Sequence, residues 1–526
     1  MSAPHSLTLS INVASQIRRD RNIICATFDS AHLYPAPECL PGSRQLVRAQ
    51  IKDVLLNNNL HGICWLNGMA GTGKSSIARS IAEDLSDRRQ LAASYFFSRG
   101  KSSRNTLQFY ISIALQLVIS IPTLKMAVTE AIRKDPDILE KRPRSQFQQL
   151  IVKPIQMLES PMSSPMVVVV DAIDECEDED LGMEIITLIA SAQENNMLPL
   201  QFLFTSRPEP YIAAKFGDIQ ISHNIHTFSL HDFDAQDDIR VFLLHRFNEI
   251  SIKRHAVIRN DTWPQAADVE TLVRRASGLF IYVATVMQFI DDRRDNPVRR
   301  LKQILEVEPK ASPAAYAGLD QLYTQILDAA ADAITLCKVL GVIATLYSPI
   351  SLAELKDLLS HESESDDVSL TLEGLHSILF IPAEEDKPVS IYHESLRDFL
   401  KDNQRSTKYC VDLPACHGII AHSVLNLMTT CFVPNLCALD HPDTFTQGLW
   451  YACEHWAIHL RDSLPSGDLI KSLEKFAATS ILCWIEALNL INELAKAQQF
   501  IRETNQWLSS KVSCPINFFT LIDEVK

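Results

Sequence analysis

One eight-residue stretch constrains this chain more than any other. Residues 68–75 read Gly-Met-Ala-Gly-Thr-Gly-Lys-Ser and fit the pattern G-x-x-x-x-G-K-[ST] of a phosphate-binding loop. The apolar run at 63–67 predicts a buried strand, and residues 76–85 repeat apolar side chains at helical spacing. The chain contains 15 glycines, and three lie between positions 68 and 73, which argues against a chance match. The sequence therefore predicts a nucleotide-binding domain.

In such a loop the backbone N–H groups point inward and the following helix adds a partial positive charge, so that phosphate is held. We expect Lys74 to reach the β- and γ-phosphates and the Ser75 hydroxyl to bind Mg²⁺. Nothing in the sequence separates ATP or ADP from GTP. The predicted nucleotide-binding residues of this segment are Gly68, Gly71, Thr72, Gly73, Lys74, Ser75 and Ser76.

A second chemical element follows four consecutive valines at 167–170, a run typical of a parallel strand buried on both faces. Asp171 comes at the carboxyl end of this strand, where open α/β sheets place their chemistry, and we expect it to bind Mg²⁺ together with Ser75. Asp174 and Glu175 are candidates for the general base that polarises an attacking water, with Glu175 preferred. An acidic surface loop is the interpretation for residues 177–180.

Two further residues are candidates for sensing phosphate. Arg207 ends the predicted strand at 200–206, where a guanidinium can both detect and stabilise a γ-phosphate. The alternative is a surface arginine before the turn at Pro208. His393 lies between a predicted hairpin and a predicted helix, and the residues alone favour a structural role for it.

The order of predicted elements indicates several domains, since 526 residues are too many for one core. Residues 39–232 alternate strands and helices, which predicts an α/β fold with a parallel sheet flanked by helices. A helical domain (233–318), a winged helix (319–405) and an all-α C-terminal region (406–526) follow, and residues 1–38 form a partly ordered leader.

Within these later domains the sequence makes finer predictions. One long helix is expected over 319–346, and a capped helix start at Ser351, with Glu354 three residues on. A solvated acidic loop is expected over 361–367, followed by a hairpin of 378–382 with 389–392.

Composition narrows the classes of partner and the compartment that are expected for this chain. The net charge of −15 argues against nucleic acid or an anionic membrane as the main partner, because phosphate surfaces need clustered Lys and Arg. The 12 cysteines lack paired spacing and predict free thiols in a reducing, cytoplasmic compartment. Cys453, His455 and His459 are interpreted as buried residues of an aromatic helix rather than metal ligands. The apolar run at 339–347 is too short to span a bilayer.

Together these residues resemble the NACHT family of STAND P-loop NTPases. The resemblance is to fungal, NLR-like members whose N-terminal NTPase is of the nephrocystin-3 type. It rests on the loop at 68–75, the acidic run at 168–176 and the strand end at 205–209. The segment Cys39-Leu40-Pro41-Gly42-Ser43-Arg44 is similar to the linker that precedes the domain in these fungal chains. Residues 277–282 stand where a Gly-x-Pro motif is expected to contact adenine, but the proline is replaced.

The resemblance implies a function. His393 matches the winged-helix histidine that contacts the β-phosphate of ADP in this family. ADP would keep the protein closed, and ATP would open it for self-association, with slow NTP hydrolysis, unidentified protein partners and a role in nonself recognition or innate immunity. The sequence shows neither the effector nor the repeats that such proteins usually carry. This leaves open a second hypothesis, a non-hydrolysing interaction scaffold with a structural or vestigial nucleotide.

Overall fold

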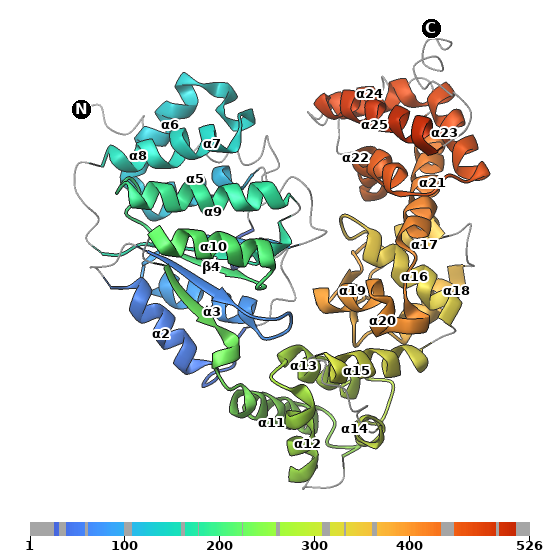
Figure 1. The fold of residues 1–526 in the computed structure, drawn as a ribbon. Helices are drawn as coiled ribbons and strands as arrows, with labels where there is room; N and C mark the ends of the chain where they lie inside the picture. Colours follow the sequence, from blue (N-terminus) through green and yellow to red (C-terminus); the bar gives the residue numbers. More distant parts are fainter. Residues whose placement is uncertain are drawn as a thin grey trace, which may run out of the picture. The chain divides into compact units, whose positions relative to one another are not determined.

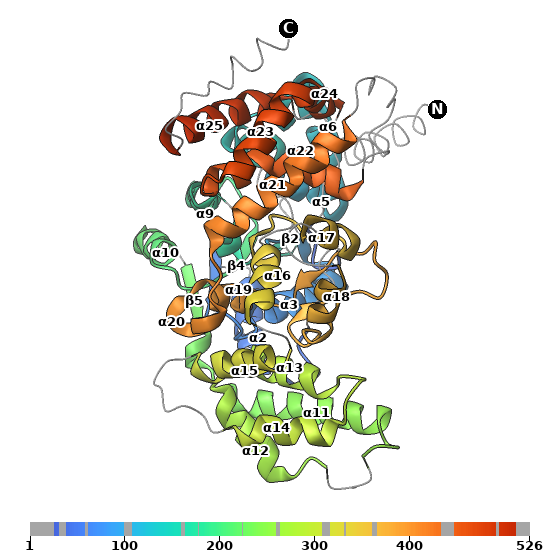
Figure 2. The same ribbon diagram turned by 90° about the vertical axis from the view of Figure 1, so that its right-hand side faces the viewer.

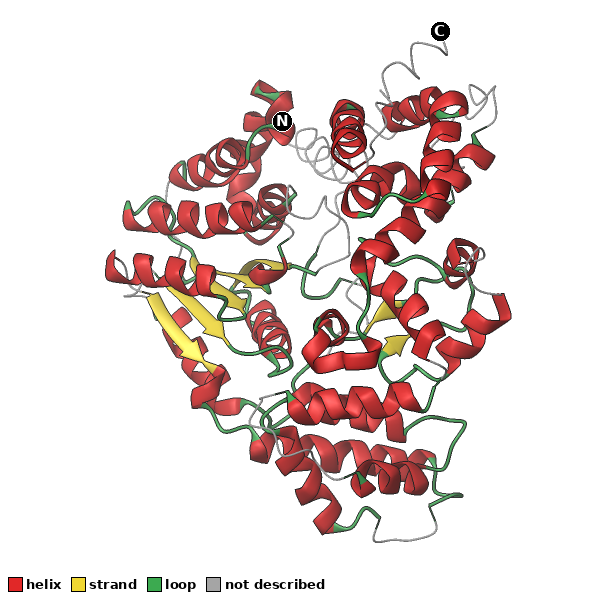
Figure 3. Cartoon of the chain, turned by 45° about the vertical axis from the view of Figure 1, so that its right-hand side comes forward, coloured by secondary structure: helices red, strands yellow, loops and turns green. Residues whose placement is uncertain are grey.

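The structure is a computed structural model in which two compact units divide the chain at residues 283 and 284. Each unit is described by itself below. The residues that the structure describes are 26–30, 38–57, 62–98, 108–158, 164–176, 178–222, 225–258, 263–307, 316–330, 333–359, 365–432, 446–490 and 494–511. Figure 3 shows strands in the sheet of the first unit and in a short hairpin of the second, with helices making up most of the rest.

The first unit contains a five-stranded sheet in the order β2-β3-β4-β1-β5, and each neighbouring pair is parallel. The predicted parallel α/β fold is therefore confirmed. Strands β1, β3 and β4 are buried along their whole length, as expected for strands covered on both faces. The strands are β1 (Ile63–Asn67), β2 (Leu91–Phe96), β3 (Val167–Asp171), β4 (Gln201–Ser206) and β5 (Ile225–Ser229).

Helices cover both faces of this sheet (Figure 1). Alternate side chains along each strand enter two different cores, because successive strand residues point to opposite faces. Leu66 and Val169 belong to the core under α2 (Gln45–Leu55) and α3 (Lys74–Asp87). Trp65 and Val170 belong to the core under the other helices of the sheet, which are α5 (Phe109–Ser120), α9 (Glu179–Glu194) and α10 (Pro210–Ser222).

Smaller helices complete the first unit. The predicted helix over 145–158 is confirmed as a helical stretch, although its middle residues, Phe147–Val152, form a π-helix. Residues 26–30 of the predicted leader lie against β2, where the Phe96 N–H donates to the Ala26 carbonyl over 2.8 Å. The remaining helices are α6 (Lys125–Lys134), α7 (Pro143–Gln146), α8 (Lys153–Gln156), α11 (Gln236–Lys253), α12 (Ala266–Ala276) and α13 (Phe280–Ile290), which runs into the second unit.

The second unit is almost entirely helical. Its hairpin pairs β6 (Leu379–Phe380) with β7 (Ser390–Ile391) in antiparallel register, as predicted. Helix α21 packs along α22 and α23 (Figure 2). The helices are α14 (Pro297–Glu306), α15 (Ala317–Asp328), α16 (Ala333–Thr345), α17 (Leu352–Leu359), α18 (Ser365–Glu373), α19 (Glu394–Lys401), α20 (Asn403–Ser406), α21 (Leu413–Cys431), α22 (Gln447–Asp462), α23 (Gly467–Thr479), α24 (Ile481–Leu490) and α25 (Ala495–Lys511).

Two predictions for this unit were wrong. The single helix over 319–346 is two helices, α15 and α16, and a close tertiary contact lies just after the end of the first one. Ala330 lies so close to Gly374 that a Cβ on that glycine would meet the alanine Cβ at 2.7 Å. The acidic loop over 361–367 was also wrong from Ser365 onward, where α18 begins.

The helix ends of this unit are set by short polar motifs. The predicted capped start at Ser351 is confirmed, since the Glu354 N–H donates to Ser351 Oγ over 3.2 Å and the Ser351 N–H donates to Glu354 Oε2 over 2.9 Å. Helix α14, which the sequence analysis missed, begins after Asn296, whose side chain accepts from the Val298 N–H.

Among the described helices, no single one is long and apolar enough to cross a membrane. One bent pair of helices, Phe109–Ser120 with Pro122–Lys134, is together long and apolar enough, judged by length and composition alone.

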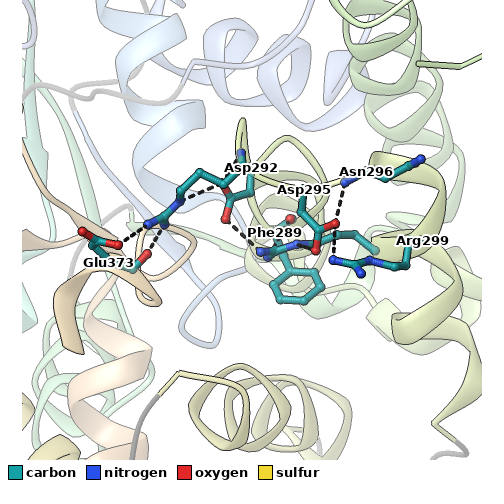
Figure 4. A network of polar contacts seen from close by, with 8 residues as sticks. Phe289, Asp292, Asp295, Asn296, Arg299 and Glu373 are labelled. Carbon is teal, nitrogen blue, oxygen red and sulfur yellow. Dashed lines mark hydrogen bonds and ion pairs between the residues drawn. The ribbon is translucent and has the colours of Figure 1, made fainter. Parts of the chain in front are cut away.

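An ion-pair network fixes the connection between α13 and α14 (Figure 4). Arg300 binds Asp292 over 2.9 Å and Asp295 over 3.1 Å, and its guanidinium lies 4.3 Å from the centre of the Phe289 ring. Arg294 reaches Glu373 at the end of α18 over 3.2 Å. The network therefore joins this connection to α18 within the second unit.

Candidate nucleotide-binding site

The phosphate loop runs from the end of β1 to the start of α3, and its glycines are required by geometry. Gly71 and Gly73 have φ angles of 82° and 96°, in the left-handed region that glycine adopts without strain. At Gly68 a Cβ would meet Thr72 Oγ1 at 2.9 Å. Gly68 also ties the loop to the neighbouring strand β4, since its N–H donates to the Ser206 carbonyl over 3.3 Å.

Lys74 is the first residue of α3 and is only 9% exposed. Its Nζ donates to the carbonyl oxygens of Gly68, over 2.7 Å, and Met69, over 3.0 Å, so the ammonium group lies against the loop. Burial lowers the pKa of Lys74, and the carboxylate of Asp174 is the main charge that opposes the shift. Ser76, in the same helical turn, is half-buried.

Asp171 is almost fully buried at the end of β3 and is held by hydroxyl groups. Thr205 Oγ1 donates to Asp171 Oδ1 over 2.5 Å and accepts from the Ala172 N–H over 2.9 Å. Burial raises the pKa of Asp171, whereas hydrogen bonds from Thr205 and Ser75 lower it. The structure thus brings together Ser75 and Asp171, the two residues predicted to bind Mg²⁺.

Thr205 is a site residue that the sequence analysis missed. It is a polar, fully buried residue near the carboxyl end of the apolar strand β4, two positions before Arg207. A polar residue within an apolar strand is the sequence signal that could have identified Thr205, because a buried hydroxyl needs a hydrogen-bond partner. Its partner, however, lies 34 positions earlier in the chain.

The two other acids of the motif differ in their surroundings. Asp174 is 3% exposed, and its carboxylate binds Arg207 twice, with Nε–Oδ2 at 3.3 Å and backbone N–Oδ1 at 3.1 Å. Glu175 is half-buried at the end of the short turn Ile173–Glu175. Ala172, which precedes this turn, has a φ of 55°, a conformation that larger branched side chains resist. The geometry therefore gives Asp174 a partner in Arg207, and it is Glu175 that is more open to solvent.

Residues 277–282 lie beside the loop. The Ile281 N–H donates to the Gly71 carbonyl over 3.1 Å, and a Cβ on Gly73 would meet the Phe280 ring at 3.8 Å. The segment expected to contact the nucleotide therefore contacts the phosphate loop, although it lacks the family's proline.

His393 belongs to the second unit, where it caps α19. Its Nδ1 accepts from the Ser395 N–H over 3.1 Å and lies 2.7 Å from Ser395 Oγ. The same hydroxyl pairs with the Tyr323 hydroxyl at 2.9 Å. Contact between His393 and a nucleotide stays a prediction.

The second unit also contains a buried histidine cluster. His459 lies 2.9 Å from His417 between their Nδ1 atoms, and its Nε2 lies 2.6 Å from the Tyr451 hydroxyl. His455 and Cys453 are buried on the same helix, as predicted. Among the described residues, no group of three or more His, Cys, Asp or Glu is arranged to hold a metal ion.

A parallel sheet with a glycine-rich loop between β1 and α3, and a buried carboxylate at the end of β3, defines a P-loop NTPase. Residues 42–207 match the family described as nephrocystin 3, N-terminal. Over 493 residues the chain is 24% identical to the vegetative incompatibility protein HET-E-1 of Podospora anserina, covering 86% of this chain and 35% of that protein. These matches confirm the predicted resemblance to fungal NACHT-type STAND NTPases. The chain spans about a third of the length of this curated relative.

Two solved structures are similar at a coarser level. The STAND protein with a tetratricopeptide repeat sensor from Pyrococcus horikoshii aligns with a TM-score of 0.39 and 12% identity, over 93% of this chain and 68% of that one. The Aeropyrum pernix Orc1 protein, solved in complex with DNA, aligns with a TM-score of 0.29 and 16% identity, over 69% and 93% of the two chains. At these scores neither structure supports a conclusion about the function of this chain.

Proposed function

We propose that this chain is a nucleotide-operated signalling switch that binds ATP or ADP with Mg²⁺ and hydrolyses ATP slowly. The observation that carries the proposal is the convergence of Lys74, Ser75 and Asp171 beside the glycine loop. GTP is the alternative nucleotide, because the base is not read by any of these groups.

The geometry supports a role for each of these residues. The loop N–H groups bind phosphate, and Lys74 exchanges the Gly68 and Met69 carbonyls for phosphate oxygens. Ser75 and Asp171 would hold Mg²⁺, which neutralises phosphate charge when bound. Glu175 orients the attacking water as general base, since the carboxylate of Asp174 already binds Arg207.

Signalling requires that ATP and ADP favour different conformations. Moving a population from mostly closed to mostly open takes about 5.5 kcal/mol of differential binding. Arg207 contacting a γ-phosphate and His393 contacting the β-phosphate of ADP would bias the protein in opposite directions. Opening would then permit self-association in the cytoplasm. The name of the fungal relative, a vegetative incompatibility protein, supports a role in nonself recognition.

The test begins with the nucleotide carried by the freshly purified full chain, released by denaturation and identified by chromatography. ADP near one per chain supports the switch. A protein that is empty and also fails to bind ATP with Mg²⁺ overturns it and favours the scaffold. Asp171→Asn should abolish Mg²⁺-dependent turnover. Lys52→Ala removes an ion pair between α2 and Asp84 of α3, away from the phosphate loop, and should preserve turnover.

A further inference from the structure

Arg44, which immediately precedes α2, occupies a place that the roles above leave unexplained. Its side chain is buried, and its Nη2 donates to the carbonyl oxygen of Thr72 in the phosphate loop over 3.0 Å. The guanidinium also lies 4.9 Å from the centre of the Phe280 ring, at the start of α13. Asp238, in the first turn of α11, accepts from the Arg44 backbone N–H over 2.9 Å, and its other oxygen is 3.8 Å from Nε. One residue therefore touches the loop, α11 and α13.

The neighbouring loop carbonyl is held from the same region. The Ile281 N–H of α13 donates to the Gly71 carbonyl over 3.1 Å. Two consecutive loop carbonyls are thus bound, one by Arg44 and one by α13. All of these residues lie in the first unit.

We propose that Arg44 is a positioning residue that fastens the phosphate loop to α11 and α13, so that nucleotide binding orders these two helices. The inference rests on the proposed nucleotide binding and deepens it. The Thr72 carbonyl and the Gly73 N–H belong to one peptide group, and the N–H groups of such a loop face the phosphate. A charge-assisted bond to the carbonyl polarises that peptide group and makes its N–H a better donor, and the reinforcement is mutual. Phosphate binding therefore strengthens the contacts that Arg44 makes with the helices, as linkage requires.

The chemistry of the side chain fits this role better than simple packing. Burial lowers the pKa of Arg44, and Asp238 is the main charge that opposes the shift. A buried cation is costly unless its geometry is favourable, and Nη1 has no hydrogen-bond partner among the described residues. A planar guanidinium can bind a carbonyl while its face covers an aromatic ring, and a lysine ammonium cannot do both.

The experiment compares the full-length wild type with Arg44→Ala and Arg44→Lys. Arg48→Ala is the matched control, because Arg48 lies one turn further along α2 and binds Asp84 over 3.0 Å. Affinity for Mg²⁺·ATP and Mg²⁺·ADP is measured by calorimetry. Hydrogen exchange of residues 236–253 and 280–290 is measured with and without saturating nucleotide.

We expect Arg44→Ala to weaken nucleotide binding severalfold, and by no more than about tenfold, because only the part of this charge-assisted hydrogen bond that strengthens on binding is lost. At saturating nucleotide the loop should still gain protection, whereas α11 and α13 should not. Arg44→Lys should restore little of the coupling, and Arg48→Ala should behave as the wild type.

A folded Arg44→Ala variant with wild-type affinity and wild-type protection of α11 and α13 overturns the inference. If that variant does not fold, Asp238→Asn and Phe280→Leu decide, since each removes one partner of the guanidinium. Loss of the nucleotide-dependent protection of α11 and α13 in both variants supports the proposed role of Arg44, and retention of that protection in both refutes it. A wild type that binds no nucleotide refutes the proposed function itself, and that result is seen before any variant is made.

Discussion

Thr205→Val removes one hydroxyl group from beneath the predicted magnesium site and keeps the shape of the side chain. The threonine is fully buried in β4, so water does not replace the lost group. Two partners are left behind. The Asp171 carboxyl loses a donor at 2.5 Å, and the Ala172 N–H loses an acceptor at 2.9 Å.

The magnitude follows from these two losses. A buried polar group left without its partner costs about 1–3 kcal/mol, so the loss of two partners should destabilise the first unit by about 2–6 kcal/mol. The higher strand propensity of valine offsets less than about 1 kcal/mol of this.

The same substitution should show a specific pH dependence. Burial already raises the pKa of Asp171, and removal of the Thr205 hydrogen bond raises it further. A carboxyl whose pKa is higher in the folded than in the unfolded state loses stability as pH rises from the unfolded value through the folded one. The deficit of the variant should therefore be larger at neutral than at acidic pH.

Hydrogen exchange of residues 201–206 in the full chain measures the local opening free energy of β4. Thr227→Val is the matched control, because Thr227 is exposed on β5 of the same sheet. If Thr205→Val were as stable as Thr227→Val, or if its deficit did not change with pH, the hydroxyl would not be holding the carboxylate as we argue.

Three further predictions follow from other contacts. Asp174→Asn breaks a pair whose carboxylate side chain is 2% exposed, and because Arg207 is 17% exposed and can turn to water, we expect a loss of about 2–3 kcal/mol in urea unfolding. Burial lowers the pKa values of His417 and His459, so as pH falls these histidines are protonated in the unfolded chain before they are protonated in the folded one. The second unit should then lose stability as pH falls below about 6.5, and unfolding curves at several pH values would reveal a flat profile if this is wrong. His393→Ala should speed the exchange of bound ADP, measured with a fluorescent analogue, and an unchanged rate would leave His393 as only the cap of α19.

The sequence was sufficient for features that depend on neighbouring residues. The glycine loop, the valine strand and the capping box at Ser351 each lie within a few positions, so their patterns identify them. Contacts between distant positions could not be predicted in this way. Thr205 meets Asp171 only because β3 and β4 are adjacent, and Arg44 meets Asp238 across 194 positions. The same limit applies to the end of α15, where Ala330 approaches Gly374, a residue 44 positions further along the chain.

The acidic motif contains two carboxylates three residues apart that have different partners. Asp171 is bound by Thr205, whereas Asp174 is bound by Arg207, the residue predicted to detect a γ-phosphate. If a γ-phosphate draws the Arg207 guanidinium away from Asp174, ATP weakens this contact, whereas ADP offers no γ-phosphate to compete. The ion pair would then be an element that ATP and ADP bias differently, which is the requirement for a population shift. Asp174→Asn should accordingly change the ratio of the ATP and ADP affinities more than it changes the affinity for ADP. An equal change in the two affinities would leave Asp174 with a role in stability alone.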